Sequence, residues 1–551
     1  MAETTTPVLV VGGGLCGLSA AIFLAWQGVP VTLVERHADT SADPKARVVN
    51  PRTMELYRAV GLEAAIRSVR SGIEGHTVVA HAPTLAAPER VRVPTVLTED
   101  VGALSPCEWA AIDQDQLEPI LRDHASDIGV DLRFGTELRA LRDTGDLVVA
   151  VLHDRATNRD HEVCARHVVA ADGCHSPVRA MLGIPHDGPG ALARLISVHF
   201  RADLTGPLAG RRIIAAILHN ETVRGTLIPL DRDRHWRFSI AIGPDEDPAA
   251  YPERRCLELV RAALGVDVPV EVIRVPDAPW EISAHVTRAA RVGRVFVAGD
   301  AAHVMPPIGA FGASTGVQDA FNLAWKLALV HRGVAGEALL DTYEDERLPV
   351  ARRTTREAVL RYEVGQGRRR TGAGEAPDAQ RNMMFGYAYG RGAFVGEPDA
   401  GVPDALPGEC VVEDPARPSG RPGSRAPHVV LRRDGVTLST VDLLGRGFRL
   451  LTGHAASGWE EAADAVAGRV GLDLACHRIG GRLHDVEGVF PVRYGVGRDG
   501  AVLVRPDGMV AWRTRDAVAD PTAVLADVVD RVLCRPARRQ HVPVGAAEAA
   551  G

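Results

Sequence analysis

Short apolar runs that end at glycine-rich turns divide the N-terminal part of the chain into strand, turn and helix. Residues 7–11 are apolar throughout, as in a strand buried on both faces, and the run GGGLCG (12–17) follows them. A helical stretch then reaches Gln27, and a second apolar run, 31–34, ends at Glu35. This order predicts a βαβ unit whose first turn carries the spacing GxGxxG.

Each residue type in this unit suits a bound dinucleotide. Gly12 permits the tight turn, Gly14 lets backbone amides approach a diphosphate, and Gly17 lets the helix pack closely on the strand. The positive end of the helix faces the anion. Glu35 can accept hydrogen bonds from the ribose hydroxyls of the adenosine. The N-terminal unit therefore predicts a dinucleotide site.

A second apolar run indicates which dinucleotide binds. Residues 295–298 end in Gly299-Asp300, about 280 residues after the first motif, so the nucleotide domain is discontinuous. A carboxylate at this strand end can hold the ribityl hydroxyls of a flavin, which a nicotinamide dinucleotide lacks. The glycine-rich stretch 306–316 then opens an amphipathic helix, 317–327, whose N-terminus can stabilise the negative N1 edge of a reduced flavin. These features favour FAD.

A third stretch, DGCHSPVR (172–179), follows the apolar run 167–170 and could by itself be a turn with a helix cap. Together with GxGxxG, Glu35 and the stretch GDAAHVMPPIGAFGASTGVQDAFNLAWKLA (299–328), it resembles the class A flavoprotein aromatic hydroxylases, the para-hydroxybenzoate hydroxylase-like family. Residues 50–55 and 114–118 also match stretches of that family. The resemblance covers about the first 390 residues.

The resemblance implies FAD as cofactor and NADPH as co-substrate, with the Asp172-Gly173 region serving both. It assigns to cofactor binding Gly12, Gly14, Leu15, Cys16, Gly17, Glu35, Arg36, Arg47, Gln114, Asp172, Gly173, Asp300, Pro307, Gly309, Gly312, Ala313 and Ser314. Arg47, Pro307 and Gly312 are the catalytic candidates, and neither a general base nor a metal site is identified. The chain has Ser at 314 and Ala at 310, where the family usually has Asn and Gly, which can shift the loop under the flavin ring.

Alternating segments in the middle of the chain predict a second sheet. They cover about 61–105 and 185–280 and suit half-exposed strands that roof the flavin, with the substrate between the layers. Trp236 lies on one of these strands, either in the core or against the substrate. Met383, Phe385 and Tyr387 form a local enrichment of soft and aromatic side chains, which suits either a pocket wall for a flat apolar ligand or a core.

Glycine and proline become frequent from 390 to 427, and a separate α/β unit follows, with hairpin turns at Asp434-Gly435 and 506–508 and a helix after Asp520. This unit resembles the thioredoxin-like C-terminal domain of phenol hydroxylases and aromatic polyketide hydroxylases, without a CxxC pair, which favours a structural role. The predicted fold is therefore α/β, a Rossmann-like FAD-binding domain with an inserted β-sheet substrate domain and a thioredoxin-like domain. Its predicted parts are 1–184 (first FAD-binding part, with part of the substrate domain near 61–105), 185–280 (substrate sheet), 281–395 (second FAD-binding part and helices), 396–427 (linker), 428–544 (thioredoxin-like domain) and 545–551 (disordered tail).

Composition narrows the partners. The chain of 551 residues is 46% apolar and 24% charged, as in an ordinary globular protein. With 63 basic and 70 acidic residues its net charge is −7, so no overall positive field exists to attract nucleic acid. The stretch 8–26 is about as long as a membrane span, but glycines interrupt it. We expect a cytoplasmic monomer or homodimer with no nucleic-acid or membrane partner.

The resemblance implies an FAD- and NADPH-dependent monooxygenase that uses O2 to hydroxylate a phenolic aromatic substrate through a C4a-hydroperoxyflavin. The similarity is greatest to enzymes that act on polycyclic aromatic polyketides. Two alternatives stay open: a Baeyer–Villiger or epoxidising monooxygenase of the same fold, and a non-catalytic flavin-binding partner protein. A flavin halogenase would carry a WxWxIP motif and an essential lysine, but no such motif occurs and both lysines, Lys45 and Lys326, lie in hydroxylase-like motifs. A disulfide oxidoreductase would need a redox-active cysteine pair, and no two cysteines of this sequence have CxxC spacing.

Overall fold

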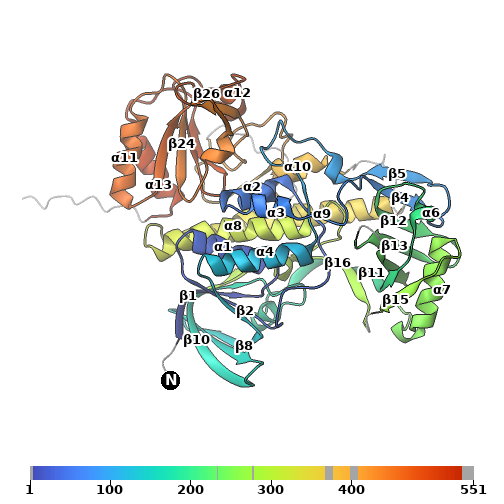
Figure 1. The fold of residues 1–551 in the computed structure, drawn as a ribbon. Coiled ribbons are helices and arrows are strands. Elements are labelled where there is room, and N and C mark those ends of the chain that lie inside the picture. The colour runs from blue at the N-terminus through green and yellow to red at the C-terminus, as the bar shows by residue number, and fades with distance from the viewer. Residues whose placement is uncertain (1–3, 232–233, 276–277, 367–376, 398–407, 536–551) are drawn as a thin grey trace, which may run out of the picture.

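The predicted βαβ unit lies at the centre of an eight-stranded sheet (Figure 1). The structure is a computed structural model that describes residues 4–231, 234–275, 278–366, 377–397 and 408–535. Strand β1 (Thr4–Val11) pairs in parallel with β2 (Val31–Glu35) and with β10 (Arg159–Ala170). β10 pairs in parallel with β18 (Val295–Val297), so the strand that precedes Gly299 joins the same sheet. The remaining strands are β7 (Asp131–Phe134), β8 (Thr136–Asp143), β9 (Val148–Asp154) and β17 (Arg291–Val292).

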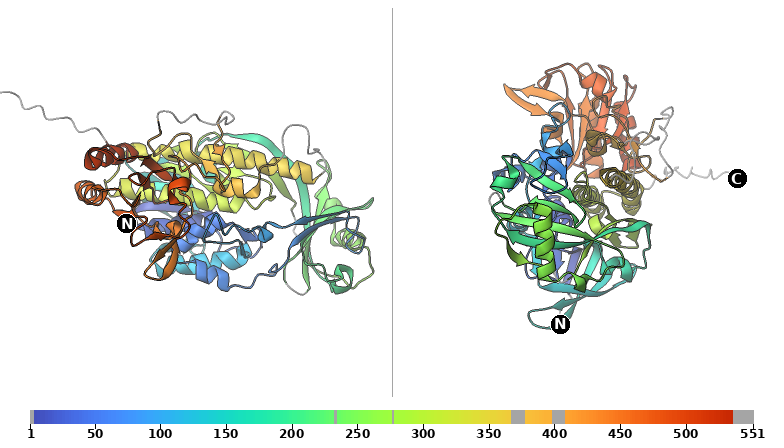
Figure 2. Two further views of the ribbon diagram at one scale, coloured as in Figure 1. Left: turned by 90° about the horizontal axis from the view of Figure 1, so that it is seen from above. Right: turned by 90° about the vertical axis from the view of Figure 1, so that its right-hand side faces the viewer.

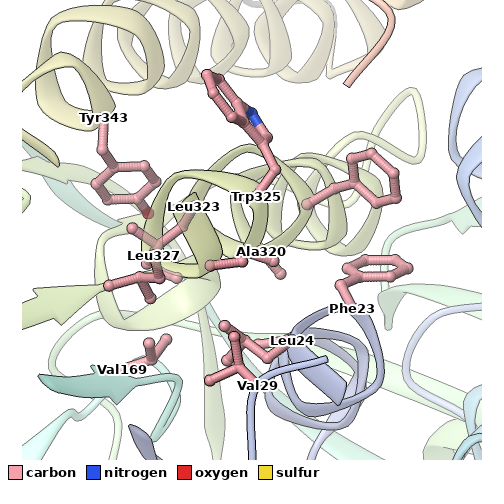
Figure 3. Packing of buried hydrophobic residues seen from close by; sticks show 14 of the residues in the cluster. Phe23, Leu24, Val29, Val169, Ala320, Leu323, Trp325, Leu327 and Tyr343 are labelled. Carbon is pink, nitrogen blue, oxygen red and sulfur yellow. The ribbon is translucent and has the colours of Figure 1, made fainter. Parts of the chain in front are cut away.

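Helices cover this sheet and form the main core. α1 (Leu15–Trp26), α4 (Gln114–Asp127) and α8 (Gly312–His331) lie over one face (Figure 1). Figure 3 shows Phe23 of α1 close to α8, and the rings of Phe23 and Phe321 meet edge to face at 4.7 Å. α8 begins five residues before the predicted start at 317, because the loop 312–316 is itself helical. Along the part of the chain that the structure describes, no helix has both the length and the apolar character required to span a bilayer.

A second, nine-stranded sheet is largely antiparallel and lies at the opposite end of the molecule from the C-terminal unit (Figures 1 and 2). Helix α7 (Glu253–Leu264) covers one of its faces. β4 joins the sheet by parallel pairing with β12, so a segment near residue 80 belongs to the same layer. The strands are β4 (Val78–Ala82), β5 (Val91–Pro94), β11 (His186–Arg201), β12 (Ile213–His219), β13 (Arg224–Pro229), β14 (His235–Ile242), β15 (Glu271–Arg274), β16 (Trp280–Thr287) and β19 (His303–Val304).

Shorter elements and one long helix connect the two sheets. α9 (Thr342–Gly365) packs beside α8 and anchors the first sheet, because the hydroxyl of Tyr343 donates to the carbonyl oxygen of Val297 (2.9 Å). The short elements are β3 (Val48–Val49), α2 (Pro51–Ala59), α3 (Glu63–Ser68), β6 (Ala110–Ala111), α5 (Pro177–Met181), α6 (Thr205–Leu208) and α10 (Gln380–Phe385), with β20 (Tyr387–Ala388) paired to β21 (Val411–Val412).

The C-terminal unit is an α/β layer that packs against the FAD-binding part. Its four-stranded sheet has the order β25-β24-β27-β28. The ring of Trp325 in α8 meets Phe448 of this unit edge to face at 5.8 Å, so the two parts share one core. The elements are β22 (Val430–Arg433), β23 (Val436–Ser439), β24 (Phe448–Thr452), α11 (Trp459–Val470), β25 (Leu474–Arg478), β26 (His484–Asp485), α12 (Phe490–Tyr494), β27 (Ala501–Val504), β28 (Val510–Thr514) and α13 (Pro521–Val532). The predicted fold class is confirmed.

The segment predicted as a linker, 396–427, is packed where the structure describes it, from residue 408 onward. Val411 and Val412 pair with β20, and Arg425 is buried in an ion pair with Glu55 of α2. The glycine- and proline-rich composition predicted a linker, and these contacts show that its described part from residue 408 packs against other segments of the chain. The predicted tail, 545–551, lies outside the described residues.

Candidate functional site

The GxGxxG turn has a conformation that excludes side chains at two of its glycines. Gly12 has φ +108°, and its N–H donates to the carbonyl oxygen of Val34 (2.9 Å). A Cβ at Gly17 would overlap the carbonyl oxygen of Gly12. At Gly14 the nearest described atom to a Cβ would be Glu118 Oε1, 3.6 Å away. The described chain therefore leaves the space in front of α1 open, and a helix N-terminus with open space before it suits a diphosphate.

Glu35 ends β2 beside this turn, as predicted. Its Oε2 accepts from the N–H of Gly13 (2.7 Å), and its Oε1 accepts from the N–H of His37 (2.8 Å). A Cβ at Gly13 would lie 2.8 Å from the Cβ of Glu35, so Gly13 is needed as well, although it stands at a variable position of the motif. Arg36 follows with an exposed side chain. The carboxylate of Glu35 thus lies at the edge of the turn, where it can meet a ribose.

Three motifs far apart in the sequence meet at Cys16. Its Sγ donates to the carbonyl oxygen of Gly316 in α8 (3.2 Å), and a Cβ at Gly299 would lie 2.9 Å from the same sulfur. A Cβ at Gly316 would in turn lie 2.9 Å from the Cα of Gly299. The first turn of α1, the Gly299-Asp300 turn and α8 are therefore in direct contact, as a single flavin dinucleotide site requires.

A cavity opens between α1, α4, β3 and the first turn of α8. The side chain of Gln114 is fixed at its edge, since its Oε1 accepts from the N–H of Ala46 (3.2 Å) and its Nε2 donates to Glu118 (2.7 Å). The cavity is lined by the predicted residues Leu15, Gln114, Ala313 and Ser314 and by Ala46, Val48, Val49, Thr53, Tyr57, Ile112, Leu117 and Val317, which the sequence analysis did not single out. An apolar cavity between two helix N-termini fits a flavin.

Asp300 presents a carboxylate near Cys16, where the three segments meet. Its side chain is exposed although the surrounding protein is dense, as expected on the floor of a cleft. Reduced solvation raises the pKa of the Asp300 carboxyl, and the positive charges of His303 and Lys45 oppose the rise. An exposed acceptor in such a place suits the hydroxyls of a ribityl chain. Together with the open α1 N-terminus and the apolar cavity, it shows that the residues present fit FAD.

The loop before α8 differs from the family pattern at a position with a positive φ. Gly309 has φ +91° and Ala310 has φ +57°. The left-handed conformation at Ala310 costs roughly 1 kcal/mol relative to glycine, the residue common there in the family. Pro307 is exposed, and Gly312 begins α8. The other departure, Ser314, is buried, and its Oγ accepts from the N–H of Asn50 (3.4 Å) at the start of α2.

The Asp172-Gly173 motif connects two of the other segments. The carboxylate of Asp172 accepts from Ser176 Oγ (2.6 Å) and from the N–H of Val178 (3.0 Å), so it assists Ser176, the N-cap residue, in capping α5. Gly173 has φ +86°. Arg179 of the same motif donates to the carbonyl oxygen of Ala301 (2.9 Å). The structure therefore shows the capping role for the Asp172 side chain, and the motif holds the Gly299-Asp300 turn in place.

Two arginines with unpaired donors lie between the flavin-binding part and the second sheet. Arg47 donates from Nε to Asp113 Oδ1 (2.6 Å), but its Nη1 is buried and has no hydrogen-bond partner within the described residues. Arg237 Nε on β14 is likewise buried and has no hydrogen-bond partner within the described residues. The pKa of Arg237 is lowered by burial and by the positive charge of Arg47, while Asp43 and Asp113 oppose the shift. Two close cations with free buried donors suit an anionic ligand.

Trp236 lies on the other side of the same strand. Its indole N–H donates to the carbonyl oxygen of Ala202 (3.1 Å), and it packs in the core beneath α7. The substrate contact proposed for Trp236 is therefore replaced by a core position. Because side chains alternate along a strand, Arg237 is the residue that faces the flavin-binding part. The sequence showed that side chains alternate along this strand, but it did not show which of the two faces is buried in the core.

Met383, Phe385 and Tyr387 are all buried but do not form one wall. Met383 packs with Phe311 of the loop before α8. Phe385 belongs to a separate cluster with Val48, Ile73, Val101, Trp109 and Met384. Tyr387 packs with Tyr389 and Met509 and donates to Gln318 Oε1 (3.3 Å). Met383 and Phe385 thus lie near the flavin site, whereas Tyr387 faces the C-terminal unit.

Comparison with known proteins agrees with this geometry. A family model described as "FAD binding domain" matches residues 5–358, and one described as "Aromatic-ring hydroxylase, C-terminal" matches 419–536. A 4-methyl-5-nitrocatechol 5-monooxygenase from Burkholderia sp is 42% identical over 97% of this chain and 98% of its own. The tetracenomycin A2 monooxygenase-dioxygenase of Streptomyces glaucescens is 41% identical, with the same coverage. A crystal structure of aklavinone-11 hydroxylase with FAD and aklavinone aligns with a TM-score of 0.90 at 39% identity, covering 97% of this chain and all of the other.

Proposed function

Because this chain belongs to the FAD-binding aromatic-ring hydroxylase family, we propose that it hydroxylates a polycyclic aromatic polyketide at a phenolic ring. It is an FAD-dependent monooxygenase that acts on aromatic substrates, with NADPH as co-substrate. The observation that carries the polyketide assignment is the match, over 97% of the chain, to a structure that holds both FAD and aklavinone.

The residues of this chain supply binding, orientation and charge. The open N-terminus of α1 and Glu35 would hold the diphosphate and the ribose, and Asp300 the ribityl chain. The N-terminus of α8 places a partial positive charge beside the cavity, where it stabilises negative charge on a reduced ring. The chemistry that bound FAD would supply is acceptance of a hydride from NADPH and activation of O2, of which one oxygen atom enters the substrate and the other leaves as water. Apolar side chains around the cavity keep water away from that reaction.

Arg47 and Arg237 support a place for the charged part of NADPH. Their buried donors, Arg47 Nη1 and Arg237 Nε, lack partners within the described residues, and Asp113 compensates only part of the charge. A phosphate of the nicotinamide dinucleotide supplies both the negative charge and the acceptor oxygens that these groups need. We assign this arginine pair to NADPH, whereas the apolar clusters around Met383 and Phe385 are assigned to the aromatic substrate.

A second candidate substrate is a single-ring catechol, which the 42% identity to the nitrocatechol monooxygenase favours. Both substrate classes are tested by reducing the purified holoenzyme with NADPH, adding O2 labelled with ¹⁸O, and offering aklavinone or 4-methyl-5-nitrocatechol. Faster flavin reduction and a singly labelled hydroxylated product with aklavinone alone would support the proposal, whereas the same result with the catechol alone would overturn it. A labelled lactone or epoxide would indicate the Baeyer–Villiger or epoxidising alternative, and flavin that NADPH never reduces would indicate a non-catalytic protein.

A further inference from the structure

Arg347 lies on α9, in a stretch of sequence to which neither the motifs nor the proposed function gives a role. Its guanidinium is buried and makes contacts in three directions. Nε donates to Asp319 Oδ1 (2.7 Å), Nη2 donates to the carbonyl oxygen of Thr315 (3.3 Å), and Nη1 donates to the hydroxyl of Tyr389 (3.3 Å). Thr315 belongs to the first turn of α8, directly after Ser314, which lines the flavin cavity.

Asp319 carries the contact of Arg347 to a second flavin segment. Its Oδ2 accepts from the backbone N–H of Gly299 (3.2 Å) and from His303 Nε2 (2.6 Å). Gly299 immediately precedes Asp300, the carboxylate assigned to the ribityl chain. Asp319 and Thr315 both belong to α8, so Arg347 holds two groups of this helix, and one of them, the Asp319 carboxylate, joins α8 to the turn that presents Asp300.

The positive groups next to Asp319 stabilise its ionised carboxylate. Burial disfavours ionisation of Asp319, but the neighbouring charges of Arg347 and His303 outweigh it, so the pKa of Asp319 is lowered. A planar guanidinium can meet an Asp319 carboxylate and a carbonyl oxygen at once from fixed directions. A lysine ammonium at the same place could neutralise Asp319 but could not hold both acceptors in a fixed relative position.

We propose that Arg347 is a positioning residue for the flavin, because it orients the Asp319 carboxylate, through which α8 holds the Gly299-Asp300 turn. The proposal rests on FAD binding in the cavity between these two turns. Arg347 itself does not line that cavity, so its effect is on the placement of the groups that do.

The chain contains a matched control in the C-terminal unit. Arg513 is buried like Arg347, although slightly more exposed (7% against 2%), and is likewise held by three groups: Nε donates to Glu397 Oε1 (2.7 Å), and Nη1 donates to the carbonyl oxygens of Ser419 (2.7 Å) and Tyr494 (2.8 Å). None of these acceptors belongs to a flavin segment. Arg347→Lys and Arg513→Lys therefore each remove one buried guanidinium, with its fixed donor directions, while keeping the positive charge.

The test measures FAD binding to the deflavinated full-length protein by flavin fluorescence, the midpoint potential of bound FAD, and the melting temperature of each apoprotein. We expect Arg347→Lys to weaken FAD binding about tenfold or more and to shift the midpoint potential of the bound FAD. Arg513→Lys should lower the melting temperature of the apoprotein as much as Arg347→Lys does, but should change FAD binding by less than about twofold.

Asp319→Asn provides a second variant that keeps an acceptor for Gly299 and removes the charge that Arg347 pairs with, and we expect it also to weaken FAD binding and shift the potential. Unchanged FAD affinity and potential in Arg347→Lys, or equal changes in Arg513→Lys, would overturn the positioning role and leave only a structural one. Failure of the wild-type apoprotein to bind FAD would instead overturn the proposed function. The two failures are therefore distinguishable.

Discussion

The Sγ of Cys16 lies 3.2 Å from the carbonyl oxygen of Gly316, and this contact joins two helices whose N-termini both face the flavin cavity. Burial raises the pKa of the Cys16 thiol well above its ordinary value, with further contributions from Asp319 and Asp300, so the thiol keeps its proton and can donate. Gly299 packs against the same sulfur. The space at Cys16 therefore controls how closely α1, α8 and the Gly299-Asp300 turn approach.

Replacement of Cys16 should show this control. Cys16→Ser keeps the size and the donor, and we expect it to purify with a wild-type amount of FAD. Cys16→Leu forces extra atoms against Gly299 and Gly316, which should cost about 1–3 kcal/mol of stability and most of the bound flavin. The ratio of flavin to protein absorbance measures both. Full flavin content in Cys16→Leu would contradict the close packing of the three segments.

The glycines of the first turn should differ in what their replacement affects. Gly14→Ala places a methyl group in open space, 3.6 Å from the nearest described atom, so the apoprotein should keep its melting temperature while FAD binding weakens. Gly17→Ala places the methyl group on the carbonyl oxygen of Gly12 and should destabilise the fold. Thermal unfolding of both apoproteins, with FAD titration, separates the effects. Equal loss of stability would show that Gly14 serves the fold and not the cofactor.

Arg237→Met should affect NADPH more than FAD. The variant removes one of two cations with unpaired buried donors, and a hydrogen bond to a charged group contributes about 1.5–3 kcal/mol, so KM for NADPH should rise about tenfold or more. The flavin spectrum and melting temperature should change little. Arg201→Met, at an exposed position of the same sheet, is the control and should leave KM unaltered. An unchanged KM in Arg237→Met would assign the arginine pair to another anion.

The two cations that share Glu346 should contribute unequally to stability. Arg505 donates to both carboxylate oxygens of Glu346 (2.6 and 2.8 Å), and Lys326 donates to one (2.8 Å). Burial and the charge of Arg505 lower the pKa of Lys326 to about 8, against the opposing charge of Glu346. Lys326→Met should therefore change the free energy of unfolding by less than about 1 kcal/mol, whereas Glu346→Gln should cost about 3–5 kcal/mol. Urea unfolding at pH 7 measures both, and the reverse order would refute this division.

His167 should make the fold sensitive to acid. Burial, together with the charges of Arg294 and Arg166, lowers the pKa of His167 from 6.5 to about 3. Below pH 6.5 the unfolded chain binds a proton that the folded chain does not, so this residue removes about 1.4 kcal/mol of stability per pH unit as the pH falls towards 3. Urea unfolding of wild type and His167→Gln between pH 7 and 4.5 checks this. The variant should lose less stability, and parallel curves would contradict the shift.

Local patterns in the sequence were sufficient for the elements and for much of the cofactor site. The apolar runs before Gly12 and Gly299 became two parallel strands of one sheet, on either side of β10, because an uninterrupted apolar run is stable only when both of its faces are covered. The requirement for glycine at position 17 is likewise local, since a Cβ there would meet the carbonyl oxygen of Gly12, whereas the space at Gly12 is also limited by Ala171 of the neighbouring strand end.

Other features depended on residues that meet only in the folded chain. Strand alternation separated Trp236 from Arg237, but the position of α7 decided that Trp236 entered the core. Proline and glycine between 390 and 427 indicated a linker, but the sequence could not show that Arg425 within it is held by Glu55, which is 370 residues distant in the sequence. The partners of Arg347 come from two other segments, α8 and the stretch at Tyr389. The spacing of residues along a chain determines the contacts made within one element or turn. The partner of a buried charge depends instead on how whole layers pack, and this packing produces no periodic pattern in the sequence.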